Sequence, residues 1–156
     1  MKLHPTKKPG APRTVADCDL SPLFRKLVAP CYDHITGQVG ESMFKLLLKR
    51  RWLHQLSESG DIEITPQGFK GLAEFGIDVE RLRASKRKPV NACIERFGGS
   101  QYPHTGSHLG ALLTDRLFEL GWLQGKGTKN YELTEAGMTG LKQLGLKPDW
   151  FPIGSS

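Results

Sequence analysis

The chain has 156 residues, enough for about one domain, and an apolar fraction of 38%, which suffices for a hydrophobic core. Its net charge of +6 favours an anionic partner such as nucleic acid. No run of about eighteen apolar residues occurs, so no membrane span is predicted, and the charged start lacks the apolar core of a signal peptide. Three widely spaced cysteines favour reduced thiols over a disulfide scaffold, and the expected location is the cytoplasm.

The first 14 residues are rich in proline and lysine, which predicts a flexible basic arm. Residues 15–153 are expected to form a single pseudo-symmetric domain built from two repeat units, residues 31–77 and 93–146. In each unit we expect a long helix, a short antiparallel hairpin and a second helix. The predicted fold class is therefore α+β and mainly helical, with two pseudo-repeated winged-helix-like units.

In the first unit, apolar residues at helical spacing predict a helix over residues 34–53. Strands are expected near residues 52–56 and 61–65, on either side of a turn. Thr65 followed by Pro66 predicts the start of a second helix, because threonine caps helices and proline is favoured at the first helical position.

Between the units, residues 78–88 are expected to form a helix that carries a dense basic cluster. Apolar residues at positions i, i+3, i+4 and i+7 then predict a short helix over residues 90–97. The second unit repeats the first, with a helix over residues 104–120, a hairpin, and a last helix from Glu135 to about Leu144.

Five residues of each unit fall in the same order and at nearly the same spacing. In the first unit they are His34, Gly40, Trp52, Thr65 and Gly68, and in the second they are His104, Gly110, Trp122, Thr134 and Gly137. This correspondence predicts equivalent tryptophan anchors where each long helix meets its hairpin. The early glycines also predict close helix packing and a surface suited to a homodimer.

Two passages carry a family resemblance. Residues 30–40 read PCYDHITGQVG, and residues 109–123 read LGALLTDRLFELGWL before YELTEAG at 131–137. They resemble the region that follows the DNA-binding domain of ArsR-type winged-helix transcription regulators, including its TCYDHLAGxLG passage. The resemblance covers most of residues 28–146 and implies a transcription-regulator module.

The resemblance and the charge together predict contact with double-stranded DNA. Basic side chains at the second hairpin and in the linker are the expected phosphate contacts. They are Lys126, Lys129, Arg81, Arg83, Lys86, Arg87 and Lys88. About thirty residues precede Cys31, fewer than a helix-turn-helix domain requires, so the alternative expectation is an effector-sensing or dimerisation domain that does not bind DNA.

A thiol and an imidazole occur in each unit and form a candidate metal site. Cys31 and His34 are expected on one side of a helix, and Cys93 is expected near His104 if the loop between them folds back. Two cysteines and histidines suit zinc or another thiophilic ion. The competing interpretation is that the cysteines are small core residues and the histidines bond to backbone at helix starts.

Enzymatic activity is not predicted, and neither is an organic cofactor. Asp33 beside His34, and the pair Asp115 and Glu119, lack a nucleophile in a recognisable elbow. The glycines around Lys126 do not have the spacing of a phosphate-binding loop.

Overall fold

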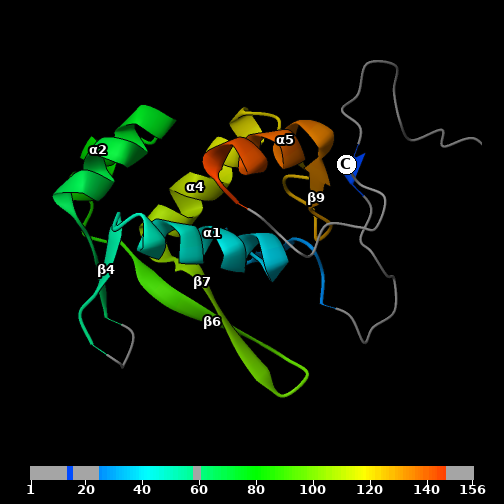
Figure 1. Cartoon of the computed structure of the whole chain (residues 1–156), viewed down its shortest axis with the longest axis horizontal. Coiled ribbons are helices and arrows are strands. Elements are labelled where there is room, and N and C mark those ends of the chain that lie inside the picture. Colours follow the sequence, from blue (N-terminus) through cyan, green and yellow to red (C-terminus); the bar gives the residue numbers. More distant parts are fainter. Residues whose placement is uncertain (1–13, 16–24, 58–60, 147–156) are drawn as a thin grey trace, which may run out of the picture.

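The computed structural model describes residues 14–15, 25–57 and 61–146 (Figure 1). Almost all of the expected basic arm, and the residues from 147 onward, lie outside this part of the chain. The fold is α+β, as predicted, but the expectation of a mainly helical fold made of two winged-helix-like units is wrong. Strands are numerous in the described residues, and they form four small antiparallel sheets.

The first half of the described chain runs from a hairpin through a long helix to a second hairpin and a second helix. Its elements are β2 (Ala29–Cys31), β3 (His34–Thr36), α1 (Gly37–Lys49), β4 (Leu53–Gln55), β5 (Ile62–Ile64) and α2 (Pro66–Phe75). A short helix, α3 (Val79–Ala84), leads to the second half.

The second half has the same order of elements. They are β6 (Asn91–Phe97), β7 (Ser100–Gly106), α4 (Ser107–Glu119), β8 (Leu123–Gln124), β9 (Glu132–Thr134) and α5 (Glu135–Leu144). A further strand, β1 (Thr14–Val15), pairs with β9 and makes that sheet three-stranded. In Figure 1 the β6–β7 hairpin is the longest pair of strands; its base lies beside the helices and its tip extends beyond them.

Two predicted helical segments are strands instead. The long helices begin only at Gly37 and Ser107, so His34 and His104 lie on the strands that precede them. Residues 91–97 form a strand because they pair with residues 100–106 across a tight turn at Gly98 and Gly99. A short apolar run can satisfy helical spacing and still form a strand when a pairing partner follows it directly.

The predicted second helices are confirmed, and their first turns are built alike. The Thr65 hydroxyl accepts a hydrogen bond from the amide of Gly68 and donates one to the carbonyl of Arg51. Thr134 makes the equivalent bonds to Gly137 and Gly121. Each helix ends at a glycine in the left-handed region, Gly76 or Gly145, a conformation that glycine adopts without the strain a side chain would bring.

The long helix of each half packs against a strand of the other half. Helix α1 packs against β7 of the other half, and α4 packs against β3. Both long helices contribute to both hydrophobic clusters: Val39 and Leu117 are buried in one, and Phe44 and Leu109 in the other. Trp52 and Trp122 are partly buried at the edges of these clusters, where helices α2 and α5 cross their indole rings at Gly71 and Gly140. The halves therefore share one interior.

The buried cap of α5 leads to a stability prediction. Thr134 is fully buried and its hydroxyl makes two hydrogen bonds, to Gly137 and Gly121. We expect Thr134→Val, which preserves shape but not the hydroxyl, to lower the free energy of unfolding by about 2 kcal/mol. Urea denaturation measures the change. Thr128→Val, an exposed threonine in the β8–β9 loop, is the control; an equal loss in both variants would contradict the expectation.

Candidate metal centre

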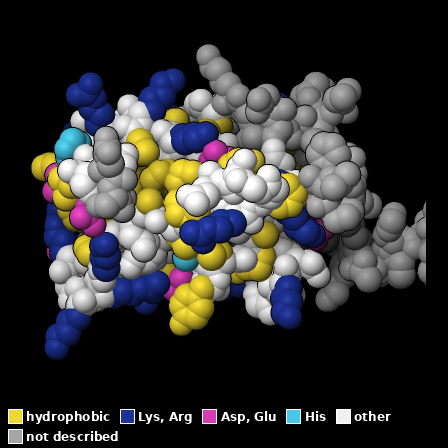
Figure 2. Space-filling view, turned by 90° about the horizontal axis from the view of Figure 1, so that it is seen from below, with side chains coloured by type: hydrophobic (Ala, Val, Ile, Leu, Met, Phe, Trp, Pro, Cys, Tyr) yellow, Lys and Arg dark blue, Asp and Glu magenta, His cyan; other side chains and the backbone are white. Residues whose placement is uncertain are grey.

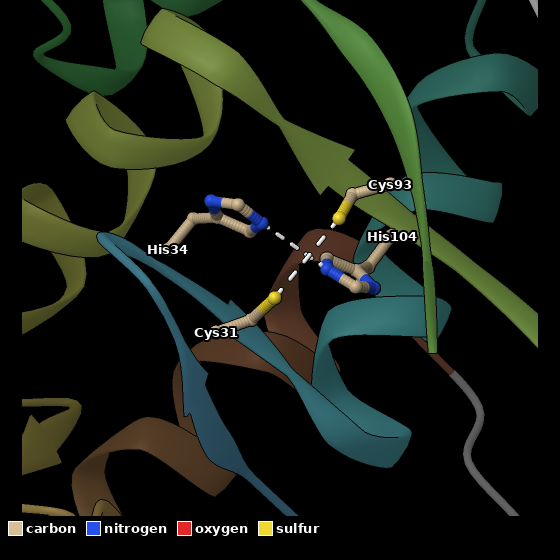
Figure 3. A group of neighbouring side chains, drawn as sticks. All are labelled: Cys31, His34, Cys93 and His104. Carbon is tan, nitrogen blue, oxygen red and sulfur yellow. Dashed lines mark hydrogen bonds between the residues drawn. The ribbon is translucent and has the colours of Figure 1, made fainter. Parts of the chain in front are cut away.

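Four side chains from the two halves meet at one point (Figure 3). They are Cys31, His34, Cys93 and His104, and their nearest ligand atoms all lie within 4.8 Å of one another. The sulfurs are 4.0 Å apart and the two Nε2 atoms are 3.2 Å apart. Both histidines are buried, whereas both cysteines are partly exposed. In the described part of the chain no other group of this kind occurs.

Two β-hairpins bring the four residues together. Cys31 and His34 are register partners across the β2–β3 hairpin, whose turn contains Tyr32 in the left-handed region. Cys93 and His104 are register partners across β6–β7. Directly paired residues on antiparallel strands project to the same face of the sheet. The predicted helical arrangement of Cys31 and His34 is therefore wrong, although the four residues themselves converge.

The unequal spacing of the two pairs follows from the hairpin lengths. Cys31 and His34 are joined by a two-residue turn, while Cys93 and His104 lie well back from the tip of a hairpin whose two strands have seven residues each. Register, rather than distance along the chain, decides which residues face each other across a hairpin. The two Cys–His pairs are therefore structurally equivalent despite their different separations in sequence.

An ion pair orients His34 from outside the cluster. Its Nδ1 atom is 3.1 Å from Asp33 Oδ1, and Asp33 Oδ2 accepts a hydrogen bond of 2.8 Å from Arg87. Burial alone would raise the pKa of the Asp33 carboxyl, but the hydrogen bonds from Arg87 and His34 outweigh it and lower that pKa. An ionised Asp33 accepts a hydrogen bond from the Nδ1–H group of His34, which leaves Nε2 directed at the centre of the cluster.

A second hydrogen-bond chain orients His104. Its Nδ1 atom is 3.2 Å from Thr36 Oγ1, which in turn donates to Glu95 Oε1 at 3.0 Å. Glu95 is paired with Arg25 at 2.9 Å, and the guanidinium of Arg25 stacks on the ring of Tyr102. These supporting residues had no recognisable signal in the sequence, because Thr36 and Glu95 lie on different hairpins and meet only in the folded chain.

Two glycines permit the halves to approach at the cluster. A Cβ atom added at Gly40 of α1 would lie 3.5 Å from the Cβ of His104, and 2.8 Å from the carbonyl oxygen of Ile35. A Cβ atom at Gly110 of α4 would lie 3.0 Å from the Cβ of His34 and would clash with the carbonyl of Thr105. Each long helix therefore packs closely against the histidine of the other half at a glycine, where no side chain intervenes.

The buried position changes the acid–base behaviour of two cluster members. Burial, with a smaller effect from His34, lowers the pKa of His104 to about 4, so its imidazole is neutral near pH 7. Burial, reinforced by Cys93, raises the pKa of the Cys31 thiol to about 11. A neutral imidazole is the form that binds metal, whereas the thiol must lose its proton to do so.

The low pKa of His104 predicts a loss of stability in mild acid when no metal is added. Above pH 6.5, the ordinary pKa, His104 is neutral in both the folded and the unfolded chain. As the pH falls from there towards 4, the unfolded chain binds a proton that the folded chain excludes, so the free energy of unfolding decreases. Urea denaturation with a chelator at about pH 7 and about pH 5 measures this, and His104→Gln should show a flatter profile. Parallel profiles would contradict it.

The predicted DNA contacts lie elsewhere and do not form one group. Arg81 and Arg83 lie on α3, while Lys86, Arg87 and Lys88 follow it. Lys126 and Lys129 lie in the β8–β9 loop. All seven side chains are exposed. On the face shown in Figure 2, Lys and Arg are scattered among apolar, acidic and other side chains.

Several of these cations already have intramolecular partners. Arg83 pairs with Glu80 and stacks on Phe69, and Lys126 lies 3.7 Å from Asp115. Arg87 pairs with Asp33, which places it in the support of His34. The structure thus links Arg87 to the candidate metal centre through Asp33, which the sequence did not indicate.

Comparisons with known proteins agree with a regulatory class. Over 119 residues the chain is 27% identical to a Bacillus subtilis (strain 168) protein described as the uncharacterized HTH-type transcriptional regulator YdfF. The match covers 75% of this chain and 51% of that protein, so the chain spans about half the length of the curated relative. No protein-family model matches the chain. No solved structure matches it significantly either. In the described residues no helix is long and apolar enough to cross a membrane.

Proposed function

We propose that this chain is an effector-sensing module of the transcription-regulator kind. The relative is named as an HTH-type transcriptional regulator, which supports a regulatory role. The observation that carries the sensing role is the meeting of Cys31 and His34 from one half with Cys93 and His104 from the other. Any effector that binds or modifies this cluster changes how the two halves are held together.

Hydrogen bonds around the cluster connect the two histidines to charged groups at the surface and on helix α1. Asp33 contacts His34 on one side and Arg87 on the other, so the position of the His34 ring is linked to the basic segment after α3. On the opposite side, Glu95 links Thr36 to Arg25, which also binds Glu41 on α1. A shift of either histidine therefore displaces a charged group at the surface or on a long helix.

A reporter experiment tests the sensing role. The full chain is joined to a helix-turn-helix domain with a known operator, and reporter output is measured with zinc, copper(I), peroxide and changes of pH. We expect at least one of these to change the output, and we expect His34→Ala combined with His104→Ala to abolish the response. Lys126→Ala with Lys129→Ala is the control and should retain it. No response under any condition would contradict the proposal.

A second candidate function is DNA contact by the exposed basic residues. Lys126 and Lys129 project from one loop, and Arg81, Arg83, Lys86, Arg87 and Lys88 belong to the segment of α3. Their exposure favours this function, but the internal partners of Arg83, Arg87 and Lys126 oppose it. The ArsR-type assignment and a homodimer remain predictions, and light scattering of the purified chain would measure the dimer.

The DNA candidate yields a direct prediction. If the β8–β9 loop contacts phosphate, Lys126→Ala with Lys129→Ala should weaken binding to any duplex and reduce the salt slope by about 2, because each contact releases about one counterion. Fluorescence anisotropy of a labelled duplex between about 50 mM and about 200 mM salt measures both quantities. Asp115→Asn, which frees Lys126 from its acidic neighbour, should instead strengthen binding. Absence of binding at the lower salt concentration would remove this candidate.

A further inference from the structure

We propose that Cys31, His34, Cys93 and His104 form a closed four-coordinate site for one zinc-class ion, which clamps the β2–β3 hairpin to the β6–β7 hairpin. The inference rests on the proposed function only in making this ion the effector; the site itself is argued from the geometry of the cluster.

The sulfur–sulfur and the nitrogen–nitrogen separations match those of a tetrahedron around a single ion. Zinc binds sulfur at about 2.3 Å and imidazole nitrogen at about 2.0–2.1 Å, so tetrahedral angles place two sulfurs about 3.8 Å apart and two nitrogens about 3.3 Å apart. The observed distances are 4.0 Å between the Cys31 and Cys93 sulfurs and 3.2 Å between the histidine Nε2 atoms. All four atoms converge on one point (Figure 3).

Hydrogen-bond accounting leaves two lone pairs facing each other at the centre. The Thr36 hydroxyl has one hydrogen, which it donates to Glu95, so it accepts from His104 Nδ1. Asp33 similarly accepts from His34 Nδ1. In neutral imidazoles both Nε2 atoms then carry lone pairs and no hydrogen, although they are 3.2 Å apart. A metal ion between them relieves this repulsion.

The sulfurs distinguish a metal ion from a proton. A proton shared by the two imidazoles needs no thiol, yet both cysteines direct their sulfurs to the same point. Two thiolates and two imidazoles suit zinc and related ions that accept tetrahedral coordination, whereas magnesium and calcium prefer oxygen ligands. The two thiolate charges neutralise a divalent ion, so the buried site gains no net charge. With four protein ligands no coordination position remains for substrate, so the site fits clamping rather than hydrolysis.

The residues around the four ligands provide the outer hydrogen bonds and the access that such a site requires. Each histidine is held through Nδ1, one by a carboxylate and the other by a hydroxyl backed by a carboxylate, which is the usual outer support of a metal-bound imidazole. The histidines are buried, but both cysteines are partly exposed, so an ion can enter from the side of the sulfurs. The sulfur separation of 4.0 Å is too long for a disulfide, whose bond is about 2.05 Å.

Metal analysis and cobalt substitution test the site on the full chain. After zinc loading and dialysis, we expect one zinc ion per chain. Cobalt in place of zinc should give the intense visible bands of a tetrahedral ion and a thiolate charge-transfer band in the near ultraviolet. Cys93→Ser should lower zinc affinity at least about 100-fold, because loss of a ligand exceeds the 10–100-fold cost of losing outer support. Cys18→Ser and His54→Asn are the thiol and imidazole controls and should bind as the unaltered chain does.

The outcomes separate this site from the proposed function. No retained zinc, or cobalt spectra without tetrahedral or thiolate bands, overturns the inference even if Cys93→Ser fails to fold, because the spectra are taken on the unaltered chain. In that case a reporter that still responds to peroxide or pH leaves the sensing role standing. Conversely, a bound ion with a silent reporter establishes the clamp and removes the sensing role.

Discussion

Cys93→Ser is expected to remove about 4 kcal/mol of zinc-dependent stability from the folded chain. A ligand that binds only the folded state adds about 4 kcal/mol at a concentration about 1,000 times its dissociation constant. Cys93 supplies one of the two sulfurs of the site and is the thiol of the β6–β7 hairpin, so its loss removes one of the four ligands that would hold this hairpin to Cys31 and His34. For a chain of this size the difference corresponds to roughly 10 °C in melting temperature.

Thermal unfolding with excess zinc and with chelator measures this effect. The unaltered chain should melt higher with zinc, while Cys93→Ser should melt at nearly the same temperature in both conditions. With chelator present, the two proteins should differ little, since Cys93 is only half-buried. Cys18→Ser should retain the full zinc effect. A zinc-dependent increase that survives in Cys93→Ser would show that the stabilising ion binds elsewhere.

Gly110→Ala should lower the free energy of unfolding by about 3 kcal/mol, at the upper end for overpacking. The added methyl group would clash with the backbone carbonyl of Thr105 and lie 3.0 Å from the Cβ of His34. A backbone carbonyl has little freedom to move aside, so α4 must shift away from Thr105 at the end of β7 and from His34 on β3. This shift also displaces His34, and zinc affinity should therefore fall together with stability.

Urea denaturation and zinc titration of the same variant measure both effects. Gly99→Ala is a useful control, because Gly99 has a positive φ of 80° but no atom near its added methyl group. Backbone strain alone should cost that variant about 1 kcal/mol and leave zinc affinity unchanged. If Gly110→Ala behaved like Gly99→Ala, the close approach of α4 to His34 would not matter for either property.

Local signals in the sequence predicted the second helices of both halves well. Thr65 with Pro66, and Thr134 with Gly137, carry capping signals within four residues, and Gly76 and Gly145 supply the left-handed termini. Such signals act within one short segment of backbone, so they can be recognised without knowing the rest of the fold. The basic residues were also placed correctly on the surface, since charged side chains rarely lose their hydration without a partner.

The strands around the cluster were not predictable in the same way. Residues 90–97 have apolar positions at helical spacing, but the structure exposes Ile94 and Arg96 while Cys93, Glu95 and Phe97 are half-buried. That alternation exists only because β7 pairs with β6 and α1 covers one side. The sequence was equally compatible with a helix beginning at His34. In the structure His34–Thr36 is a strand, and the helix begins only at Gly37.

By itself, the sequence determined the candidate ligands Cys31, His34, Cys93 and His104 by residue type, and the caps that begin and end α2 and α5. Only the tertiary structure decided that these ligands lie on paired strands rather than on helices, and that Asp33 and Thr36 orient the two imidazoles. Capping acts between residues a few positions apart. The candidate metal centre depends on hairpin register and on the packing of α1 and α4 against strands of the opposite half. These bring together residues about 60–70 positions apart and leave no local pattern in the sequence.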